Sequence, residues 1–118
     1  INQIRIYNDE LICTGPKGIF KMNLYTEKVS PLFKSGKYYG NTCFLIDSKG
    51  YIWLAYGKGV WKINLENEED KVQYRSGENG LGTFPISQII EDKEGRIFLG
   101  TRGSGLFHYD EKNKRFIG

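Results

Sequence analysis

Short apolar runs recur along the whole chain, and clusters of Gly, Asn, Asp and Ser separate them. In Ile52-Trp53-Leu54 and Ile97-Phe98-Leu99 no polar residue interrupts the run, as is typical of strands buried on both faces. The β-branched and aromatic residues in these runs favour strands over helices. The pattern predicts three groups of four short strands: residues 3–7, 10–14, 19–24 and 28–32; residues 42–46, 51–56, 60–65 and 71–75; and residues 86–91, 96–101, 106–109 and 115–117.

The three groups are copies of one repeat. The segment GIFKMN that begins at Gly18 returns as GVWKIN at Gly59, 41 residues later, and as GLFHYD at Gly105, a further 46 residues along. The run DSKGYIWL from Asp47 likewise returns as DKEGRIFL from Asp92, 45 residues later. Four short antiparallel strands in a unit of roughly forty residues indicate an all-β fold built from β-propeller blades.

Turn residues separate the strands within each copy. The Asp-x-x-Gly segments that begin at Asp47 and Asp92 suit a type I turn closed by a glycine with positive φ. Aromatic residues recur at equivalent strand positions, and we expect them to fill the core between blades: Phe20, Trp53, Trp61, Phe98 and Phe107.

The repeat divides the chain into a diverged blade one (residues 1–40), a blade two (41–82) and a blade three (83–118) with a truncated fourth strand. A closed propeller usually has about four to eight blades, so three blades leave two open surfaces. Either the chain is a segment of a larger propeller, whose remaining blades cover these surfaces, or copies of the chain associate face to face. Because the open surfaces should be apolar, we expect self-association.

Composition and charge exclude several other classes. The 118 residues include 17 Lys and Arg and 14 Asp and Glu, so the net charge is 17 − 14 = +3. That balance is too weakly basic to indicate nucleic-acid binding. No apolar run approaches the roughly 18 residues of a membrane helix, and no signal peptide opens the chain. We therefore expect any export signal or membrane anchor to lie in the parent protein.

Metal and cofactor sites are not expected. Cys13 and Cys43 form no CxxC motif and His108 is the only histidine, which leaves too few ligands for structural zinc. Both cysteines lie in apolar runs, so we expect two buried thiols. No DxDxDG spacing indicates calcium, and the loop at residues 100–105 lacks the ending of a phosphate-binding loop.

Catalytic motifs are also absent, since neither GxSxG nor HExxH occurs. His108 occupies a repeat position that holds Lys21 and Lys62 in the other copies, which indicates a solvent-facing position. The acidic run at residues 68–70 is interpreted as a solvated turn between the third and fourth strands of blade two. Nothing designates the pair of carboxylates that a glycosidase needs, and we expect a non-catalytic segment.

The most specific motif lies in the third copy. Residues 86–101 (ISQIIEDKEGRIFLGT) and 105–110 (GLFHYD) follow the pattern I-x-x-I-x-x-D-x-x-G-x-[IL]-W-[IL]-G-T, then G-[IL]-x-x-[FY]-[DN], with Phe98 in place of the tryptophan. The preceding NGL at residues 79–81 matches the usual approach to such a blade. The chain thus resembles the two-component regulator propeller repeat family, strongly over residues 79–117 and moderately over 41–75.

This resemblance implies a biological setting. Such repeats mostly build the ligand-sensing ectodomain of bacterial hybrid two-component sensors, which lies in the periplasm and is tethered by a membrane helix to a histidine kinase. Many of these sensors respond to oligosaccharides and switch on the genes for the enzymes that degrade them. The implied partners are an oligosaccharide and the remaining blades, with membrane contact only through the parent protein.

Propeller ligands commonly bind one face, built from loops between blades and from turns between the second and third strands. Aromatic faces beside amide and cationic groups suit sugars, sulfate or carboxylate groups. The expected ligand-binding residues on these loops are Tyr38, Tyr39, Asn41, Tyr56, Lys58, Asn79 and Arg102. Two functions follow: a glycan-sensing module, or a protein-interaction or dimerisation scaffold with no small ligand. A propeller-fold lyase or hydrolase is less favoured.

Overall fold

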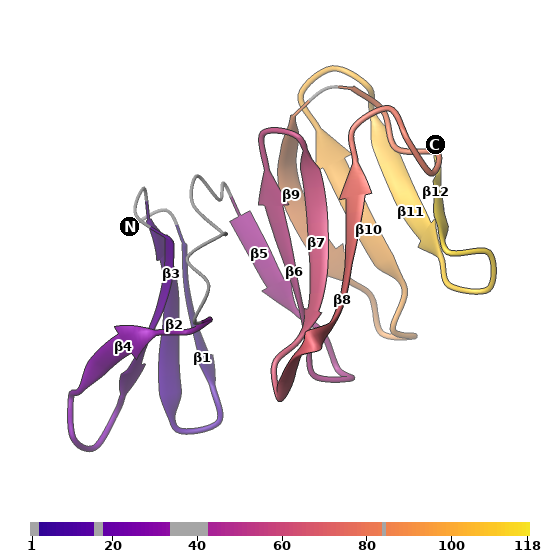
Figure 1. Ribbon diagram of the computed structural model, residues 1–118. Coiled ribbons are helices and arrows are strands. Elements are labelled where there is room, and N and C mark those ends of the chain that lie inside the picture. The colour runs from indigo at the N-terminus through magenta and orange to yellow at the C-terminus, as the bar shows by residue number, and fades with distance from the viewer. Residues whose placement is uncertain (1–2, 16–17, 34–42, 84) are drawn as a thin grey trace.

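The three-dimensional structure is a computed structural model that describes residues 3–15, 18–33, 43–83 and 85–118. It confirms the all-β fold, with three four-stranded antiparallel sheets that stand side by side (Figure 1). The described residues form no helix, and so none that could cross a membrane. The molecule measures 43 × 29 × 23 Å.

Each sheet contains four strands that are consecutive in the sequence and paired in sequence order. The first sheet comprises β1 (Gln3–Tyr7), β2 (Glu10–Gly15), β3 (Gly18–Asn23) and β4 (Val29–Pro31). The second comprises β5 (Cys43–Ile46), β6 (Tyr51–Tyr56), β7 (Gly59–Asn64) and β8 (Asn67–Arg75). The third comprises β9 (Ile86–Glu91), β10 (Ile97–Thr101), β11 (Leu106–Asp110) and β12 (Arg115–Ile117).

One strand boundary differs clearly from the prediction. The acidic run at residues 68–70 was expected in a turn, but it lies within β8, which begins at Asn67. Asp70 is held there because its carboxylate accepts hydrogen bonds from the Tyr51 hydroxyl (2.6 Å) and from Asn64 Nδ2 (3.2 Å). Side-chain partners on β6 and β7 therefore extend the outer strand into a segment that looked like a loop.

The second sheet is packed on both faces, as expected for a blade with neighbours. Successive side chains on a strand point to opposite faces. Ile52, Leu54 and Ile63 lie on the face that packs against Ile12 and Ile19 of the first sheet. The opposite face, which packs against β9 to β12, carries Trp53, Ala55, Val60 and Tyr74. Continuous apolar character in β6 thus reflects burial between two sheets.

The aromatic prediction holds for some positions and fails for others. Trp53 and Phe107 are buried in the core between the second and third sheets, and Trp61 packs partly buried against the first. Phe20 and Phe98 are only half-buried. Each lies on the outer face of an end sheet, and in the part of the chain described no further sheet covers that face.

These two outer faces are rich in exposed apolar side chains. On the first sheet, Ile6 is 69% exposed and Val29 61%. On the third, Leu106 is 60% exposed and lies opposite Gly100, on the face of Phe98. We call them the first-sheet and third-sheet open faces. Their apolar character agrees with the expectation from the repeat.

The cysteine prediction is half correct. Both cysteines are thiols, and Cys43 is buried. Cys13 is only half-buried, because its register partner on β3 is Phe20 and both lie on the first-sheet open face.

The loop between the second and third sheets is anchored by the NGL segment. The Asn79 carbonyl accepts a hydrogen bond from the Phe116 amide (2.7 Å), and Leu81 is 4% exposed in the core of the third sheet. Gly80 lies between them with φ +81°, and a Cβ atom there would lie 1.9 Å from the Phe116 carbonyl oxygen. Only glycine fits this approach, which places the loop against β12.

Candidate functional site

A pocket of about 480 Å³ lies beside the turn between β6 and β7. Tyr56 ends β6, Lys58 follows in the turn, and Gln73, Arg75 and Ser76 line the pocket from β8 and its end. The prediction named Tyr56 and Lys58, and the structure brings these two together. We call this the Tyr56 pocket.

Hydrogen bonds hold both the tyrosine side chain and the backbone of the turn at the Tyr56 pocket. Tyr56 is half-buried and its hydroxyl accepts a short hydrogen bond from the Gln73 side chain. The Lys58 carbonyl accepts a hydrogen bond from the Ser76 amide (2.7 Å), which ties the turn to the end of β8. An aromatic ring, an ammonium, a guanidinium, an amide and the Glu78 carboxylate therefore line one pocket. This set can stack against a sugar ring and donate hydrogen bonds to its oxygens.

Other predicted ligand residues lie elsewhere. The backbone of Asn79 serves the contact with β12, and Arg102 is exposed after β10 with its amide bonded to the Pro85 carbonyl (3.0 Å). Neither lines the Tyr56 pocket. Tyr38, Tyr39 and Asn41 lie outside the described residues.

Sequence reasoning missed Gln73 and Arg75. Both lie on β8, two residues apart, so they point to the same face of the strand. That alternation is visible in the sequence, but the two residues lie on a strand, whereas the expected ligand residues lie on loops and turns.

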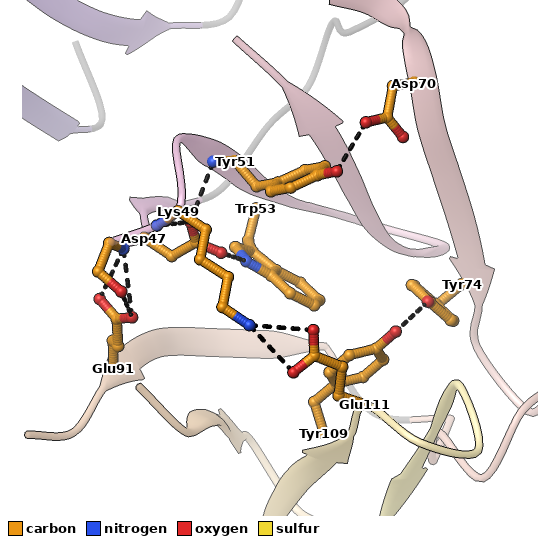
Figure 2. Close-up of polar contacts among 10 residues, drawn as sticks. Asp47, Lys49, Tyr51, Trp53, Asp70, Tyr74, Glu91, Tyr109 and Glu111 are labelled. Atoms are coloured by element: carbon orange, nitrogen blue, oxygen red, sulfur yellow. Dashed lines mark hydrogen bonds and ion pairs between the residues drawn. The ribbon is translucent and has the colours of Figure 1, made fainter. Parts of the chain in front are cut away.

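A second cleft, of about 570 Å³, lies at the opposite end of the sheets. It is lined by the two Asp-x-x-Gly turns, which join β5 to β6 and β9 to β10, and by the start of the turn after β11. Figure 2 shows Asp47, Lys49 and Trp53 of the second sheet facing Glu91, Tyr109 and Glu111 of the third. We call this the turn cleft.

Asp47 organises one wall of the turn cleft. Its Oδ1 accepts hydrogen bonds from the amides of Lys49 (2.9 Å) and Tyr51 (3.0 Å), which closes the turn. Its Oδ2 accepts a hydrogen bond from the Trp53 indole (2.9 Å). The turn aspartate therefore also orients a buried aromatic ring, a role the sequence analysis did not assign.

The third sheet carries the same turn with a different partner. Asp92 Oδ1 accepts hydrogen bonds from the amides of Glu94 (3.0 Å) and Arg96 (2.8 Å). Phe98 has no indole N–H to offer, and the Arg96 guanidinium donates to Asp92 Oδ2 instead (2.6 Å). The backbone and side-chain hydrogen bonds from Arg96 help to lower the pKa of Asp92. The substitution of phenylalanine for tryptophan is thus compensated two residues earlier.

The aromatic rings behind the turn cleft form one cluster across the two sheets. The Trp53 ring meets the Tyr109 ring edge-on at 5.0 Å, and the Tyr74 and Tyr109 hydroxyls are 2.7 Å apart. Burial is the main cause that raises the pKa of Tyr109, followed by the hydrogen bond to Tyr74. Both phenols therefore stay neutral and join the two sheets through a partly buried hydrogen bond.

Lys62 corrects the prediction of a solvent-facing repeat position. His108, its equivalent, is exposed as expected, because it lies on the third-sheet open face opposite Phe98. Lys62 is half-buried, because the third sheet covers its face. Its ammonium lies 4.6 Å from the Tyr51 ring centroid and 5.3 Å from that of Trp53.

The described residues contain no group of three or more His, Cys, Asp or Glu side chains placed to hold a metal ion. Carboxylates of the turn cleft hold the two sheets together. Glu91 accepts hydrogen bonds from the Ser48 amide (3.0 Å) and hydroxyl (2.7 Å). Glu111 accepts a hydrogen bond from the Lys49 ammonium (3.0 Å), and this bond is the main cause that lowers the pKa of Glu111.

Similar solved structures exist. A structure described as the extracellular domain of a hybrid two component system, BT4673 from B. thetaiotaomicron, matches with a TM-score of 0.86 at 22% identity, over 100% of this chain and 15% of that one. Another structure of the BT4673 extracellular domain, described as part of a one component system, matches with a TM-score of 0.83 at 21% identity. That match covers 98% of this chain and 15% of the other. The extracellular domain of BT3049, described as a hybrid two component system of the same organism, gives 0.71 at 18% identity, over 98% and 16%.

No protein-family model matches the chain, and neither does any curated protein. The chain spans about 15% of the length of the solved structures it matches. Its fold is that of a section of the extracellular domains of these B. thetaiotaomicron proteins.

Proposed function

We propose that this chain is a non-catalytic, ligand-sensing segment of the periplasmic propeller of a two-component sensor. In this proposal the parent protein is held in the inner membrane and carries a histidine kinase and response regulator that act on transcription. Support comes from the repeat motifs and from the similarity of the fold, over nearly the whole chain, to extracellular domains described as parts of hybrid two component systems.

We infer that the ligand is an oligosaccharide and that it binds in the Tyr56 pocket. The observation that carries this assignment is the convergence of the half-buried Tyr56 ring with Lys58, Gln73 and Arg75 around about 480 Å³. Flat aromatic faces and fixed N–H donors are the groups that recognise sugar rings and their acidic substituents. The proposal predicts binding of neutral or acidic oligosaccharides without turnover.

The test is a glycan array followed by calorimetry on the 118-residue chain. Tyr56→Ala should weaken binding of the best saccharide at least about tenfold, equivalent to ~1.4 kcal/mol, with the fold retained by circular dichroism. Lys28→Ala, a change at an exposed residue in the turn between β3 and β4, is the matched control and should bind normally. Unchanged affinity in Tyr56→Ala, or no saccharide bound at all, would contradict this assignment.

The alternative is a protein-interaction or dimerisation scaffold, and the two open faces favour it. Exposed apolar side chains such as Ile6 and Leu106 mark surfaces that bind other protein surfaces. A scaffold predicts no saccharide binding and loss of association when a charge is placed on an open face. Calorimetry and sedimentation on the same variants separate the two functions.

A further inference from the structure

The free edges of the three sheets border a groove of about 470 Å³. β1, β5 and β9 each lie at the edge of their sheet, and residues of all three strands line the groove. A strand at an edge has backbone N–H and C=O groups that no neighbouring strand takes. Backbone as well as side-chain groups therefore border this groove, which we call the edge groove.

The Gln3 side chain takes such backbone groups at one point of the edge groove. Its Oε1 accepts a hydrogen bond from the Phe44 amide of β5 (2.9 Å), and its Nε2 donates one to the Phe44 carbonyl (2.5 Å). One residue of an edge strand is thus bound at both its donor and its acceptor. A primary carboxamide can do this because it carries a carbonyl acceptor and an N–H donor side by side.

Ile89 is the equivalent of Phe44 in the third sheet. Phe44 lies opposite Leu54 on β6, and Ile89 lies opposite Leu99 on β10. These two leucines end the repeated runs DSKGYIWL and DKEGRIFL. Opposite residues of an antiparallel ladder alternate between pairs that bond to each other and pairs whose amides and carbonyls point away. The Gln3 contact shows that Phe44 belongs to a pair of the second kind.

The hairpins of the second and third sheets have the same alternation. The Asp47 amide donates to the Tyr51 carbonyl (2.8 Å), and the Asp92 amide donates to the Arg96 carbonyl (3.0 Å). Ile89 lies as far before the bonded Asp92 as its equivalent lies before Asp47, so it also belongs to an outward-pointing pair. The Ile89 amide and carbonyl therefore face away from β10, on the side of the edge groove.

Among the described residues, the cap found at Phe44 is not repeated at Ile89. Cys43 holds the position of Gln3, because the two lie opposite residues that face the second position of the GVWKIN and GIFKMN segments. A thiol lacks the paired carbonyl and N–H of a carboxamide. Within the described part of the chain, the Ile89 amide and carbonyl have no hydrogen-bond partner. Ile89 is only 6% exposed, so a ligand that satisfies this donor and acceptor is favoured.

Charge favours a neutral ligand in the edge groove. Among the described residues that line it, only Arg5 and Glu91 are charged, one of each sign. The Arg5 guanidinium donates to the Ile4 carbonyl (2.8 Å), and the Glu91 carboxylate accepts from Ser48. The lining therefore has no net charge that would select an anion or a cation.

We propose that the edge groove binds a neutral ligand through a carboxamide that pairs with Ile89 as Gln3 pairs with Phe44. The ligand carbonyl accepts from the Ile89 amide, and the ligand N–H donates to the Ile89 carbonyl. A primary amide and a cyclic lactam both have these groups on one side, whereas a trans secondary amide has them on opposite sides. The described lining of the edge groove shares no residue with the Tyr56 pocket, so the two sites are independent.

The experiment follows the Ile89 amide signal by NMR in the ¹⁵N-labelled 118-residue chain. The probes are propionamide (a primary amide), 2-pyrrolidinone (a lactam) and N-methylacetamide, a trans secondary amide that is an isomer of propionamide. We expect a saturable shift of the Ile89 signal with propionamide, the lactam or both, and at least tenfold weaker binding of N-methylacetamide. Tighter binding of propionamide would identify an open-chain carboxamide as the ligand group, and tighter binding of 2-pyrrolidinone a cyclic lactam.

Two results of this comparison would overturn the proposal. One is a shift of the Ile89 signal with N-methylacetamide as large as with the other probes, or no shift with any probe. The other is saturable binding of only an extended dipeptide analogue, N-acetylvaline methylamide, which would indicate strand addition at β9.

Removal of the existing cap gives a second test. Gln3→Ala should open the Phe44 amide and carbonyl, so propionamide should shift the Phe44 signal in this variant and not in the unsubstituted chain. Gln3 is half-buried at the start of β1, and circular dichroism should show the fold retained. Asn113→Ala, which removes an exposed carboxamide from the turn after β11, is the matched control and should leave Phe44 unresponsive. A folded Gln3→Ala variant whose Phe44 signal ignores propionamide would also overturn the proposal.

Discussion

Replacing Gly80 by alanine tests how the loop between the second and third sheets is held. Gly80 has φ +81°, and a Cβ atom there would lie 1.9 Å from the Phe116 carbonyl oxygen. Because Cβ contacts below 3.0 Å essentially do not occur, the loop and β12 must separate by about 1 Å, the difference between these distances. That movement would break the Phe116–Asn79 hydrogen bond and loosen the packing of Leu81.

A second glycine provides the matched control. Gly77 has φ +83°, but the atom nearest to a Cβ there is Thr83 Cγ2 at 3.7 Å, an ordinary contact. Both alanine variants therefore bear the cost of a left-handed conformation, about 1 kcal/mol. Gly80→Ala should lose a further ~1 kcal/mol for the hydrogen bond and ~1–2 kcal/mol for the packing. The expected totals are about 1 kcal/mol for Gly77→Ala and about 3–4 kcal/mol for Gly80→Ala.

Urea unfolding followed by tryptophan fluorescence measures both free energies of unfolding by linear extrapolation. Trp53 is a suitable probe because its ring packs against Tyr109 and Phe116 of the third sheet. Equal losses of stability in the two variants would show that the loop does not approach β12 closely.

Three further outcomes are expected. Tyr74→Phe and Tyr109→Phe should each lower the free energy of unfolding by ~1–3 kcal/mol, because each leaves the other, partly buried hydroxyl without its partner. In a double-mutant cycle the double variant should lose less than the sum of the two single variants. The pKa of Tyr109 is raised above its ordinary value of 10.0, so the unfolded chain ionises at this tyrosine before the folded chain does. The stability contributed by neutral Tyr109 is therefore fully present below pH 10.0 and declines above it. Urea titrations between pH 9 and 12 should show a smaller loss of unfolding free energy with rising pH in Tyr109→Phe. The isolated 118-residue chain should self-associate through its open faces. Leu106→Glu or Ile6→Lys should shift its sedimentation toward that of the monomer. Persistence of the same oligomer in both variants would exclude these faces as the site of association.

Most of the fold was predictable because strand pairing in this chain is local. Each strand pairs with its sequence neighbour, so alternation and turn residues suffice to locate it. The exception is β8, where acidic residues suggested a loop and the Tyr51–Asp70 contact holds a strand. That contact joins residues 19 positions apart, beyond the reach of a local pattern.

Burial between sheets was less predictable, since it depends on which neighbour a face has. Lys62 and His108 occupy equivalent repeat positions, but the third sheet covers only Lys62. Trp53 and Phe98 differ for the same reason. The repeat pattern tells which face of its sheet a residue lies on. Whether another sheet packs on that face depends on where the sheet lies among the three.

The candidate site was predictable in part. Turn position alone placed Tyr56 and Lys58 in one pocket, because both flank the same tight turn. The turn cleft escaped prediction because Lys62, Asp47 and Tyr109 come from different strands and turns of two sheets. Their juxtaposition depends on sheet packing rather than on spacing in the sequence.

If these three sheets are consecutive blades of a larger sensor propeller, the gene must continue on both sides of the region that encodes them. The nucleotide sequence on both sides of the coding region for this chain tests it most directly. We expect an open reading frame that continues into further Asp-x-x-Gly repeats, a membrane-spanning helix and a histidine kinase. A start codon immediately before residue 1 and a stop codon immediately after residue 118 would contradict it.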